Sequence, residues 1–240
     1  MTEKSRNFFS RLRRFALKVI LGFFLLSIAS VILFRWVPVP VTQLMLIRCV
    51  QQKTEGKPLK LAKSWVSLEK INPDLQLAVV CSEDQNFLRH HGFDYDAIER
   101  AIDYNDNHKR KRGASTISQQ TAKNVFLWPG RSWVRKGLEV YFTFLIEMFW
   151  SKERIMTVYL NVIEMGDGVY GAEAASREYF HKSARNMNKL ECASIAAVLP
   201  NPRKFNAARP DVFVQNRRAW ILNQMILWGG ILNYNPEIKK

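Results

Sequence analysis

The pattern of apolar and polar residues begins with a segment that carries no charge. It covers residues 19–34, and it reaches about 20 residues when Lys18 and Arg35 snorkel to a membrane surface and Leu17 and Trp36 are included. That length predicts a transmembrane helix over residues 16–36. A cleaved signal peptide and a buried core helix are the alternatives, but the segment exceeds a usual signal core and no clear small-x-small cleavage site follows it.

The residues before this segment are strongly basic. Six basic side chains precede residue 19, and Glu3 is the one acid among them. The positive-inside rule keeps such a flank in the cytoplasm. We therefore expect a basic cytoplasmic tail at residues 1–15, a linker and membrane-proximal segment at residues 37–64, and an outward-facing domain at residues 65–240.

Helical periods dominate this domain and alternating strand patterns are scarce, so we expect a mostly α fold. Asn72 and Pro73 predict the start of a helix that Gly92 ends. Thr116 and Gln119 fit a capping box and predict a second helix start. The other expected segments are a basic loop at residues 105–113, helices at residues 131–151, 152–162, 171–180, 190–199 and 211–228, and a break around residues 166–168.

The chain carries 36 lysine and arginine residues against 21 aspartate and glutamate residues, a formal charge of +15. When residues 1–35 are set aside, with seven basic and one acidic side chain, +9 remains for the rest. Such a charge predicts an anionic partner, which is a nucleic acid, an acidic lipid surface or a phosphorylated substrate. Hydrophobic residues make up 48% of the chain, which excludes intrinsic disorder.

Two neighbouring acids, Glu83 and Asp84, follow the apolar run LQLAVVC. Burial disfavours a charged carboxylate, so an acid in such a segment must titrate, form an ion pair or react. Glu83 is therefore a candidate general base. A structural salt bridge with Arg89 or a hydrogen bond to a loop explains either acid equally well, and one acid can do each job.

A cluster of cations lies between Glu83 and a second acid. Lys123 is followed by Arg131, Arg135 and Lys136, and four cations in this short stretch can cradle a diphosphate. A solvated basic face is the alternative. Glu139 lies one helical turn after Arg135, where it fits either an ion pair or the second carboxylate of an acid/base pair.

Polar residues on the second predicted helix are candidates for substrate contact. Gln119, Gln120, Lys123 and Asn124 share one face, while Ser115 and Gln119 also fit a capping role. The aromatic residues nearby predict either an interfacial patch or ordinary core packing: Trp128, Trp133, Phe142, Phe144, Phe149 and Trp150.

The three cysteines, Cys49, Cys81 and Cys192, form no C-x-x-C pair, so we expect small buried residues rather than a metal site or a disulfide framework. His90 and His91 have no second ligand cluster at a recognised spacing. A zinc site is therefore not expected.

Five segments together resemble the motifs of one family. The first is E-D-x-x-F-x-x-H-x-G-x-D at residues 83–94, and the second is G-x-S-T-I-x-Q-Q-x-x-K-N at residues 113–124. The third is R-K-x-x-E at residues 135–139, and two longer segments begin at Tyr159 and Glu191. Their order and spacing resemble the peptidoglycan glycosyltransferases, the lysozyme-like polymerases of lipid II, and among these the monofunctional biosynthetic transglycosylases of Gram-negative bacteria.

This resemblance implies a lysozyme-like glycosyltransferase domain after one N-terminal transmembrane helix. It implies that Glu83 is the general base toward the 4-hydroxyl of the acceptor sugar. Lys123, Arg131 and Lys136 would stabilise the departing pyrophosphate, and Glu139 would organise those cations or a divalent ion. The residues that would bind substrate are Ser115, Gln119, Gln120, Lys123, Asn124, Arg131, Arg135 and Lys136.

The resemblance also implies the partners and the location. They are lipid II and the nascent glycan strand, the lipid bilayer and, as an open question, cell-wall synthesis or division proteins. No nucleic acid and no organic cofactor are expected, and a need for Mg²⁺ or Mn²⁺ stays open. The location implied is the bacterial inner membrane, with the N-terminus cytoplasmic and the catalytic domain periplasmic.

Three other classes of protein remain as alternatives. A lytic lysozyme-like hydrolase explains paired carboxylates but leaves the cations without a purpose, because its leaving group is no pyrophosphate. A membrane-tethered nucleic-acid-binding protein leaves the buried Glu83 unexplained. A non-catalytic envelope scaffold is not refuted by the sequence.

Overall fold

The computed structural model describes residues 3–108, 113–130 and 132–234, with side chains from Ser10 onward. The chain divides after Val37 into two compact units, which are described separately.

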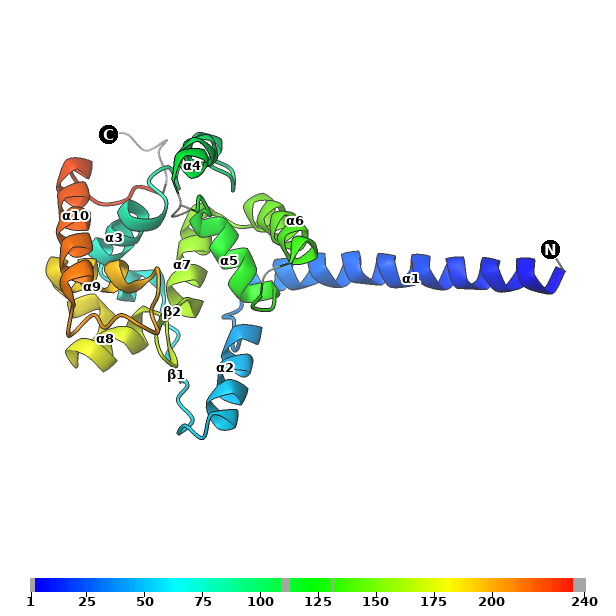
Figure 1. The fold of residues 1–240 in the computed structure, drawn as a ribbon, viewed down its shortest axis with the longest axis horizontal. Coiled ribbons are helices and arrows are strands. Elements are labelled where there is room, and N and C mark those ends of the chain that lie inside the picture. The colour runs from blue at the N-terminus through cyan, green and yellow to red at the C-terminus, as the bar shows by residue number, and fades with distance from the viewer. Residues whose placement is uncertain (1–2, 109–112, 131, 235–240) are drawn as a thin grey trace. The chain divides into compact units, whose positions relative to one another are not determined.

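The first unit is the long helix α1 (Glu3–Phe34), drawn in blue in Figure 1. Its segment Ser10–Phe34 has a hydropathy of 2.5, and 11% of the most apolar window is buried inside the protein. A core helix would be mostly buried. The helix therefore has the length and composition to cross a membrane, as the charge-free segment predicts.

The second unit is mostly α in its described residues, as expected (Figure 1). Its helices are α2 (Gln43–Thr54), α3 (Pro73–Glu83), α4 (Tyr95–Asn107), α5 (Ile117–Phe126), α6 (Trp133–Phe149), α7 (Lys152–Val162), α8 (Ala172–Phe180), α9 (Lys189–Val198) and α10 (Val212–Trp228). Two short 3₁₀ turns, η1 (Leu68–Lys70) and η2 (Ala184–Asn186), complete the helical elements.

A small sheet joins distant parts of this unit. Strand β1 (Ala62–Lys63) pairs in parallel with β3 (Val169–Tyr170), and β2 (Glu164–Gly166) pairs with β3 in antiparallel fashion. The turn between β2 and β3 contains Gly168 at a φ of +68°, where an added Cβ would lie 2.4 Å from the carbonyl oxygen of Lys60. The predicted break around residues 166–168 is thus a hairpin turn that only glycine fits.

The core forms where apolar helices meet. Helix α9 packs against α3 and α10, and α5 packs against α6 and α7. Every residue of α3 from Leu75 to Cys81 is buried, as a helix that is apolar on most sides requires. Cys81 and Cys192 lie in this core and Cys49 is half-buried, all three as free thiols.

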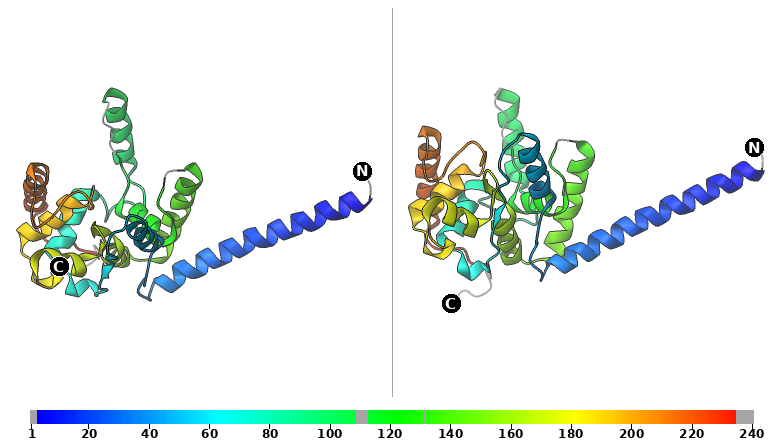
Figure 2. Two further views of the ribbon diagram at one scale, coloured as in Figure 1. Left: turned by 60° about the horizontal axis from the view of Figure 1, so that its bottom comes forward. Right: turned by 90° about the horizontal axis from the view of Figure 1, so that it is seen from below.

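Two boundary predictions are wrong. The helix that starts at Pro73 ends at Glu83 and not at Gly92, because Asp84 leaves helical geometry with φ −162° and ψ 79°. Residues 105–107 belong to α4 rather than to a loop, and residues 109–112 of the predicted basic loop lie outside the described residues. Helix α4 buries none of its residues and stands away from its neighbours (Figure 2).

The predicted aromatic patch divides between core and surface. Phe142 and Trp150 are buried, and the Phe142 ring stacks on Phe126 with 4.6 Å between ring centroids. Trp133 is 92% exposed, and Phe144 and Trp128 are also exposed. An interfacial role is therefore limited to the exposed members.

Candidate active site

The carboxylate of Glu83 lies at the end of α3 and faces open space. Its Oε2 accepts a hydrogen bond from Nε2 of Gln120 at 3.0 Å, and its Oε1 accepts from Oγ of Ser82 at 3.1 Å and Nη2 of Arg217 at 3.3 Å. Glu83 lines two cavities of about 400 and 900 Å³, here called the Glu83 cavities, and Ser115 and Trp220 line both. This carboxylate is held in place by donors and still has room for a ligand beside it.

Gln120 is oriented by a buried tyrosine. The hydroxyl of Tyr159 donates to Oε1 of Gln120 at 3.2 Å, which turns the amide nitrogen of Gln120 toward Glu83. Complete burial raises the pKa of Tyr159 well above its ordinary value, and the nearby Glu83 and Asp84 raise it further. Tyr159 is therefore a neutral donor throughout the physiological pH range.

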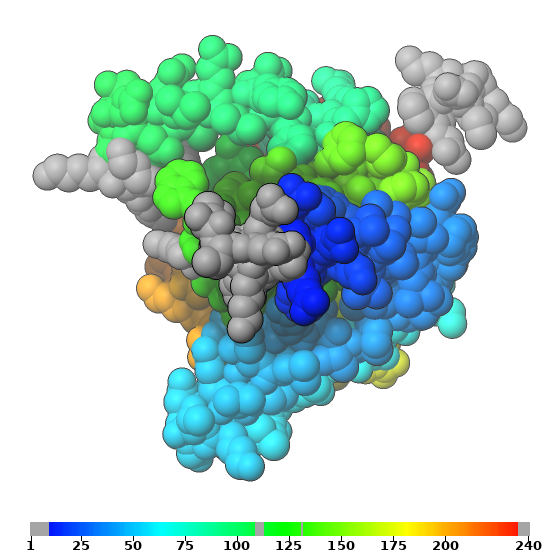
Figure 3. Space-filling model, turned by 90° about the vertical axis from the view of Figure 1, so that its right-hand side faces the viewer, coloured from blue at the N-terminus to red at the C-terminus, as the bar shows by residue number. Residues whose placement is uncertain are grey.

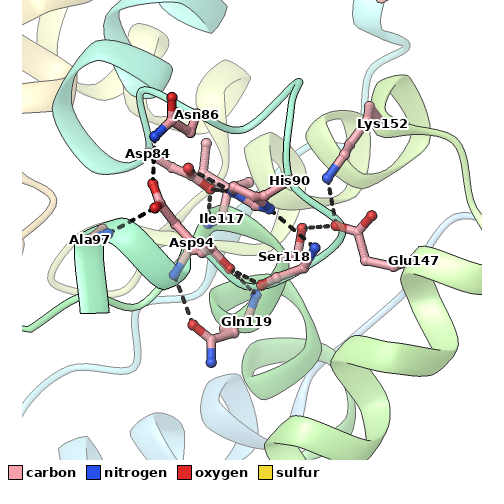
Figure 4. A network of polar contacts seen from close by, with 12 residues as sticks. Asp84, Asn86, His90, Asp94, Ala97, Ile117, Ser118, Gln119, Glu147 and Lys152 are labelled. Atoms are coloured by element: carbon pink, nitrogen blue, oxygen red, sulfur yellow. Dashed lines mark hydrogen bonds and ion pairs between the residues drawn. The ribbon is translucent and has the colours of Figure 1, made fainter. Parts of the chain in front are cut away.

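The neighbouring carboxylate, Asp84, is fully engaged inside the protein (Figure 4). Nε2 of His90 lies 2.9 and 3.0 Å from its two oxygens, and the backbone N–H of Ile117 donates to Oδ2 at 2.9 Å. The Asp84 side chain is 1% exposed. Of the two acids, Asp84 is thus structural, and its partner is His90 rather than the expected Arg89.

The turn after Asp84 is closed by further bonds. The backbone N–H of Gly92 donates to Nδ1 of His90 at 3.1 Å, so the proton shared with Asp84 lies on Nε2. Oγ1 of Thr116 donates to the carbonyl oxygen of Gly92 at 2.7 Å. We call Asp84, His90, Gly92, Thr116 and Ile117 the Asp84 network, and it ties the end of α3 to the start of α5 (Figure 4).

The cations of the sequence prediction gather around Glu139. Nη1 of Arg135 lies 2.9 Å from Oε2 of Glu139, and Nζ of Lys136 lies 2.5 Å from Oε1. Glu139 is buried and lines none of the cavities described here. It therefore holds two cations in position. Arg131, the fourth predicted cation, lies outside the described residues.

Lys123 differs from the other cations. Within the described residues, its ammonium group has no hydrogen bond or ion pair. Burial lowers the pKa of Lys123, and the charges of Arg135 and Lys136 lower it further, whereas Glu139 and Glu83 oppose the shift. A desolvated cation without an anion of its own is suited to binding one from outside.

Lys123 and Arg135 line a third cavity of about 390 Å³, together with Gln120 and Asn124. We call it the cation cavity. Gln120 connects it with Glu83, because its side chain donates to that carboxylate. The structure thus brings a candidate base and a candidate phosphate site to opposite sides of one amide.

The remaining predicted substrate residues have mixed positions. Ser115 is exposed beside Glu83, and Nδ2 of Asn124 donates to the carbonyl oxygen of Gln120 at 2.7 Å. Oε1 of Gln119 accepts from the backbone N–H of Thr116 at 3.0 Å in the predicted capping box. Gln119 is buried and lines none of the three cavities described here; the structure shows its capping role, and its contact with substrate stays a prediction.

Three residues near these cavities were not predicted from the sequence. Arg217 of α10 contacts Glu83, and Arg48 and Glu164 line the cation cavity. The Nε atoms of Arg48 and Arg217 are buried without a partner in the described part of the chain. Arg217 lies between the polar residues Asn216 and Arg218, so its sequence neighbours give no signal that could have identified it.

The residues around Glu139 do not fit a divalent ion. Both of its oxygens accept from cations, and the described residues contain no group of three or more His, Cys, Asp or Glu side chains that could hold a metal. The same holds for His90, whose ring nitrogens are both engaged. The mechanism below therefore uses no metal.

Comparison with known proteins identifies the family. A family model described as Transglycosylase matches residues 52–226. The chain is 56% identical over 220 residues to a biosynthetic peptidoglycan transglycosylase of Bdellovibrio bacteriovorus, covering 92% of this chain and 88% of that one.

Two further proteins of the same name give similar values. The one from Bacteroides thetaiotaomicron is 54% identical over 230 residues, covering 96% of this chain and 92% of that one. The one from Escherichia coli is 50% identical over 232 residues, covering 96% of each. This chain therefore belongs to the transglycosylase family.

Proposed function

We propose that this peptidoglycan glycosyltransferase polymerises lipid II into β-1,4-linked glycan strands, with undecaprenyl pyrophosphate as the leaving group. The observation that carries the proposal is the pairing of two sites across Gln120. A carboxylate faces the Glu83 cavities, and Lys123, which has no hydrogen bond or ion pair among the described residues, faces the cation cavity. Transfer of a sugar from a diphosphate needs both.

Glu83 is the general base in this proposal. It removes the proton from the 4-hydroxyl of the acceptor sugar, and that oxygen forms the new bond to the anomeric carbon of the donor. The bond from this carbon to the diphosphate breaks in the same step, so the configuration inverts and no covalent enzyme intermediate forms. Gln120 and Arg217 orient the carboxylate through their hydrogen bonds.

Lys123 and Arg135 receive the charge that develops on the diphosphate. Preset cations in a desolvated site stabilise such charge more strongly than they stabilise the ground state. Glu139 acts indirectly, since it holds Arg135 and Lys136 and lines no cavity described here. We propose that Arg131 and Lys136 complete the cationic surface, and that Ser115 and Asn124 contact the sugars.

The cation cavity also weighs against the alternative classes of protein. A lytic hydrolase transfers the sugar to water and releases no diphosphate, so it needs no unpaired lysine beside its base. A scaffold has no use for either feature. The names of the relatives agree with synthesis, since each is called biosynthetic.

The location follows from the anchor. We propose that α1 spans the bacterial inner membrane, with the basic N-terminus in the cytoplasm and the catalytic unit in the periplasm. Both the substrate and the leaving group carry a lipid tail, so anchoring keeps the enzyme where they are. Cell-wall synthesis or division proteins are proposed partners without a surface assigned to them.

The test is a polymerisation assay with the full chain in detergent and labelled lipid II. The wild type should give a ladder of glycan on a gel, and lysozyme should digest it. Glu83→Gln should abolish the ladder, whereas Glu99→Gln, at an exposed position on α4, should leave it unchanged. Parallel reactions with Mg²⁺, Mn²⁺ and a chelator measure the metal requirement. Near wild-type polymer from Glu83→Gln would exclude this base.

A further inference from the structure

The cation cavity has a second basic wall that the family motifs do not supply. Leu44 and Arg48 of α2 line it together with residues of α5. Helix α2 packs against α5, and Arg48 lies before residue 52, where the match to the family model begins. A segment that the sequence describes only as membrane-proximal thus contributes to the diphosphate site.

Arg48 has unused hydrogen-bonding capacity. Its Nη1 donates to Oε1 of Gln51 at 2.8 Å, and its Nη2 lies 3.5 Å from Oε2 of Glu164, at the limit of a hydrogen bond. Its Nε is buried and has no partner among the described residues. A guanidinium has five donors in a fixed fork that matches a phosphate group. Within the described residues, each Nη of Arg48 uses one N–H and keeps a second one for a ligand.

Glu164 keeps this guanidinium at the cavity. Its side chain is 8% exposed, and the hydroxyl of Tyr170 lies 3.4 Å from its Oε1. Burial raises the pKa of Glu164, although the charge of Arg48 works in the opposite direction. Because the contact between Nη2 of Arg48 and Glu164 is long, at 3.5 Å, Arg48 can turn part of its fork toward an incoming anion while Glu164 still keeps it at the cavity.

We propose that Arg48 binds the diphosphate of the lipid-linked substrate together with Lys123, with Glu164 as its positioning residue. This inference rests on the proposed function, because it assigns a residue to the same site. The alternative for Arg48 is structural: it only neutralises the buried Glu164. The two interpretations differ in what happens when both charges are removed.

The first measurement is steady-state polymerisation by Arg48→Gln, with inorganic pyrophosphate as a competing probe. We expect the KM for lipid II and the inhibition constant of pyrophosphate to rise at least about tenfold, as the loss of charged hydrogen bonds predicts. Lys53→Gln removes the same charge from an exposed position on the same helix and should match the wild type. Arg48→Lys keeps the charge but not the fork, so it should recover part of the affinity.

The deciding variant is Arg48→Gln combined with Glu164→Gln. If Arg48 only neutralises Glu164, the double variant should recover wild-type KM and pyrophosphate inhibition. If Arg48 binds the diphosphate, both constants should stay high in the double variant while its thermal unfolding matches the wild type. Recovery in the double variant, or wild-type constants in Arg48→Gln, overturns the inference. A wild type that makes no polymer overturns the proposed function instead.

Discussion

Charged groups are fully paired in the Asp84 network, whereas some of those at the cation cavity have no bonded partner among the described residues. Asp84 has three contacts to its two oxygens, and His90 is engaged at both ring nitrogens. On the other side of Glu83, Lys123 has no partner in the described residues, and the Nε atoms of Arg48 and Arg135 are unpaired. Figure 3 shows α4 and α2 at opposite ends of one face of the second unit. Helix α4 lies in the chain between Gly92 and Thr116 of the Asp84 network, and α2 carries Arg48.

This difference separates fold from function. A polar network in which every group is satisfied rigidifies the chain at its position, whereas a half-buried cation without a bonded anion is costly until an anion arrives. Two neighbouring residues thus differ in role: the oxygens of Asp84 accept hydrogen bonds inside the protein and stabilise the fold, whereas Glu83 faces the cavities and serves the reaction. The comparison predicts that changes in one region affect stability and that changes in the other affect catalysis.

The largest expected effect is that of Lys123→Gln on turnover. Removing a preset charge that faces a developing anion lowers kcat by roughly 10²- to 10³-fold. Stability should not fall, because the lowered pKa of Lys123 means that the folded protein disfavours its charge. Single-turnover rates and thermal unfolding of the same preparation test both statements. A large loss of thermal stability would place Lys123 with the structural charges.

The reverse result is expected for Asp84→Asn. The change removes the charge that accepts from His90 and from the start of α5, and breaking a buried pair costs about 3 kcal/mol. Chemical denaturation measures this loss, and kcat per folded molecule at low temperature should change much less than in Lys123→Gln. A variant with wild-type stability and no activity would make Asp84 a catalytic residue. The division between structural charges in the Asp84 network and catalytic charges at the cation cavity would then be wrong.

The same division explains what the sequence could predict. The starts of α5 and α10 follow from local signals, a capping box at Thr116 and an aspartate cap at Asp211. The end of α3 does not, because the Asp84 carboxylate leaves the helix to bond with residues that are distant in the chain. Residues 85–91, QNFLRHH, contain neither proline nor glycine, so the sequence gives no local sign of the turn before Gly92.

The site divides in a similar manner. The residues on α5 and α6 form a short, dense pattern, so Lys123, Arg135 and Glu139 could be predicted to act together. Arg217 reaches Glu83 only because α10 packs against α3, and Arg48 reaches the cation cavity only because α2 packs against α5. Such contacts are products of tertiary structure, and one sequence contains no local signal for them.

A smaller effect is expected at Gly92, where the Asp84 network closes. Its φ of +92° is one that other residues rarely adopt, and an added Cβ would lie 2.9 Å from Cγ2 of Thr143. Gly92→Ala should therefore destabilise the protein by about 1 to 2 kcal/mol through backbone strain and crowding. Gly113→Ala, at an open position with no neighbour within 4 Å, is the control. Equal melting temperatures of the two variants would contradict the strain.

The smallest effect is a shift in the pH dependence, and it separates activity from stability most sharply. The pKa of Lys123 lies below that of an exposed lysine, so the site loses its cation earlier as the pH rises. Turnover should then fall on the alkaline side. In the same interval the unfolded chain binds a proton that the folded chain has lost, so the free energy of unfolding rises with pH.

Lys123→Arg tests the assignment, because a guanidinium stays protonated through this range. The alkaline fall in kcat/KM should move to higher pH in Lys123→Arg and should vanish from the residual activity of Lys123→Gln. The alkaline rise in stability, taken as the difference from Lys123→Gln, should disappear in both variants. If kcat/KM falls at the same alkaline pH in the wild type, Lys123→Arg and Lys123→Gln, another group titrates there. Lys123 would then stay protonated throughout the range. If activity falls and the free energy of unfolding rises over the same alkaline pH range, Lys123 is the group responsible. Its charge then destabilises the folded protein but is required for the reaction.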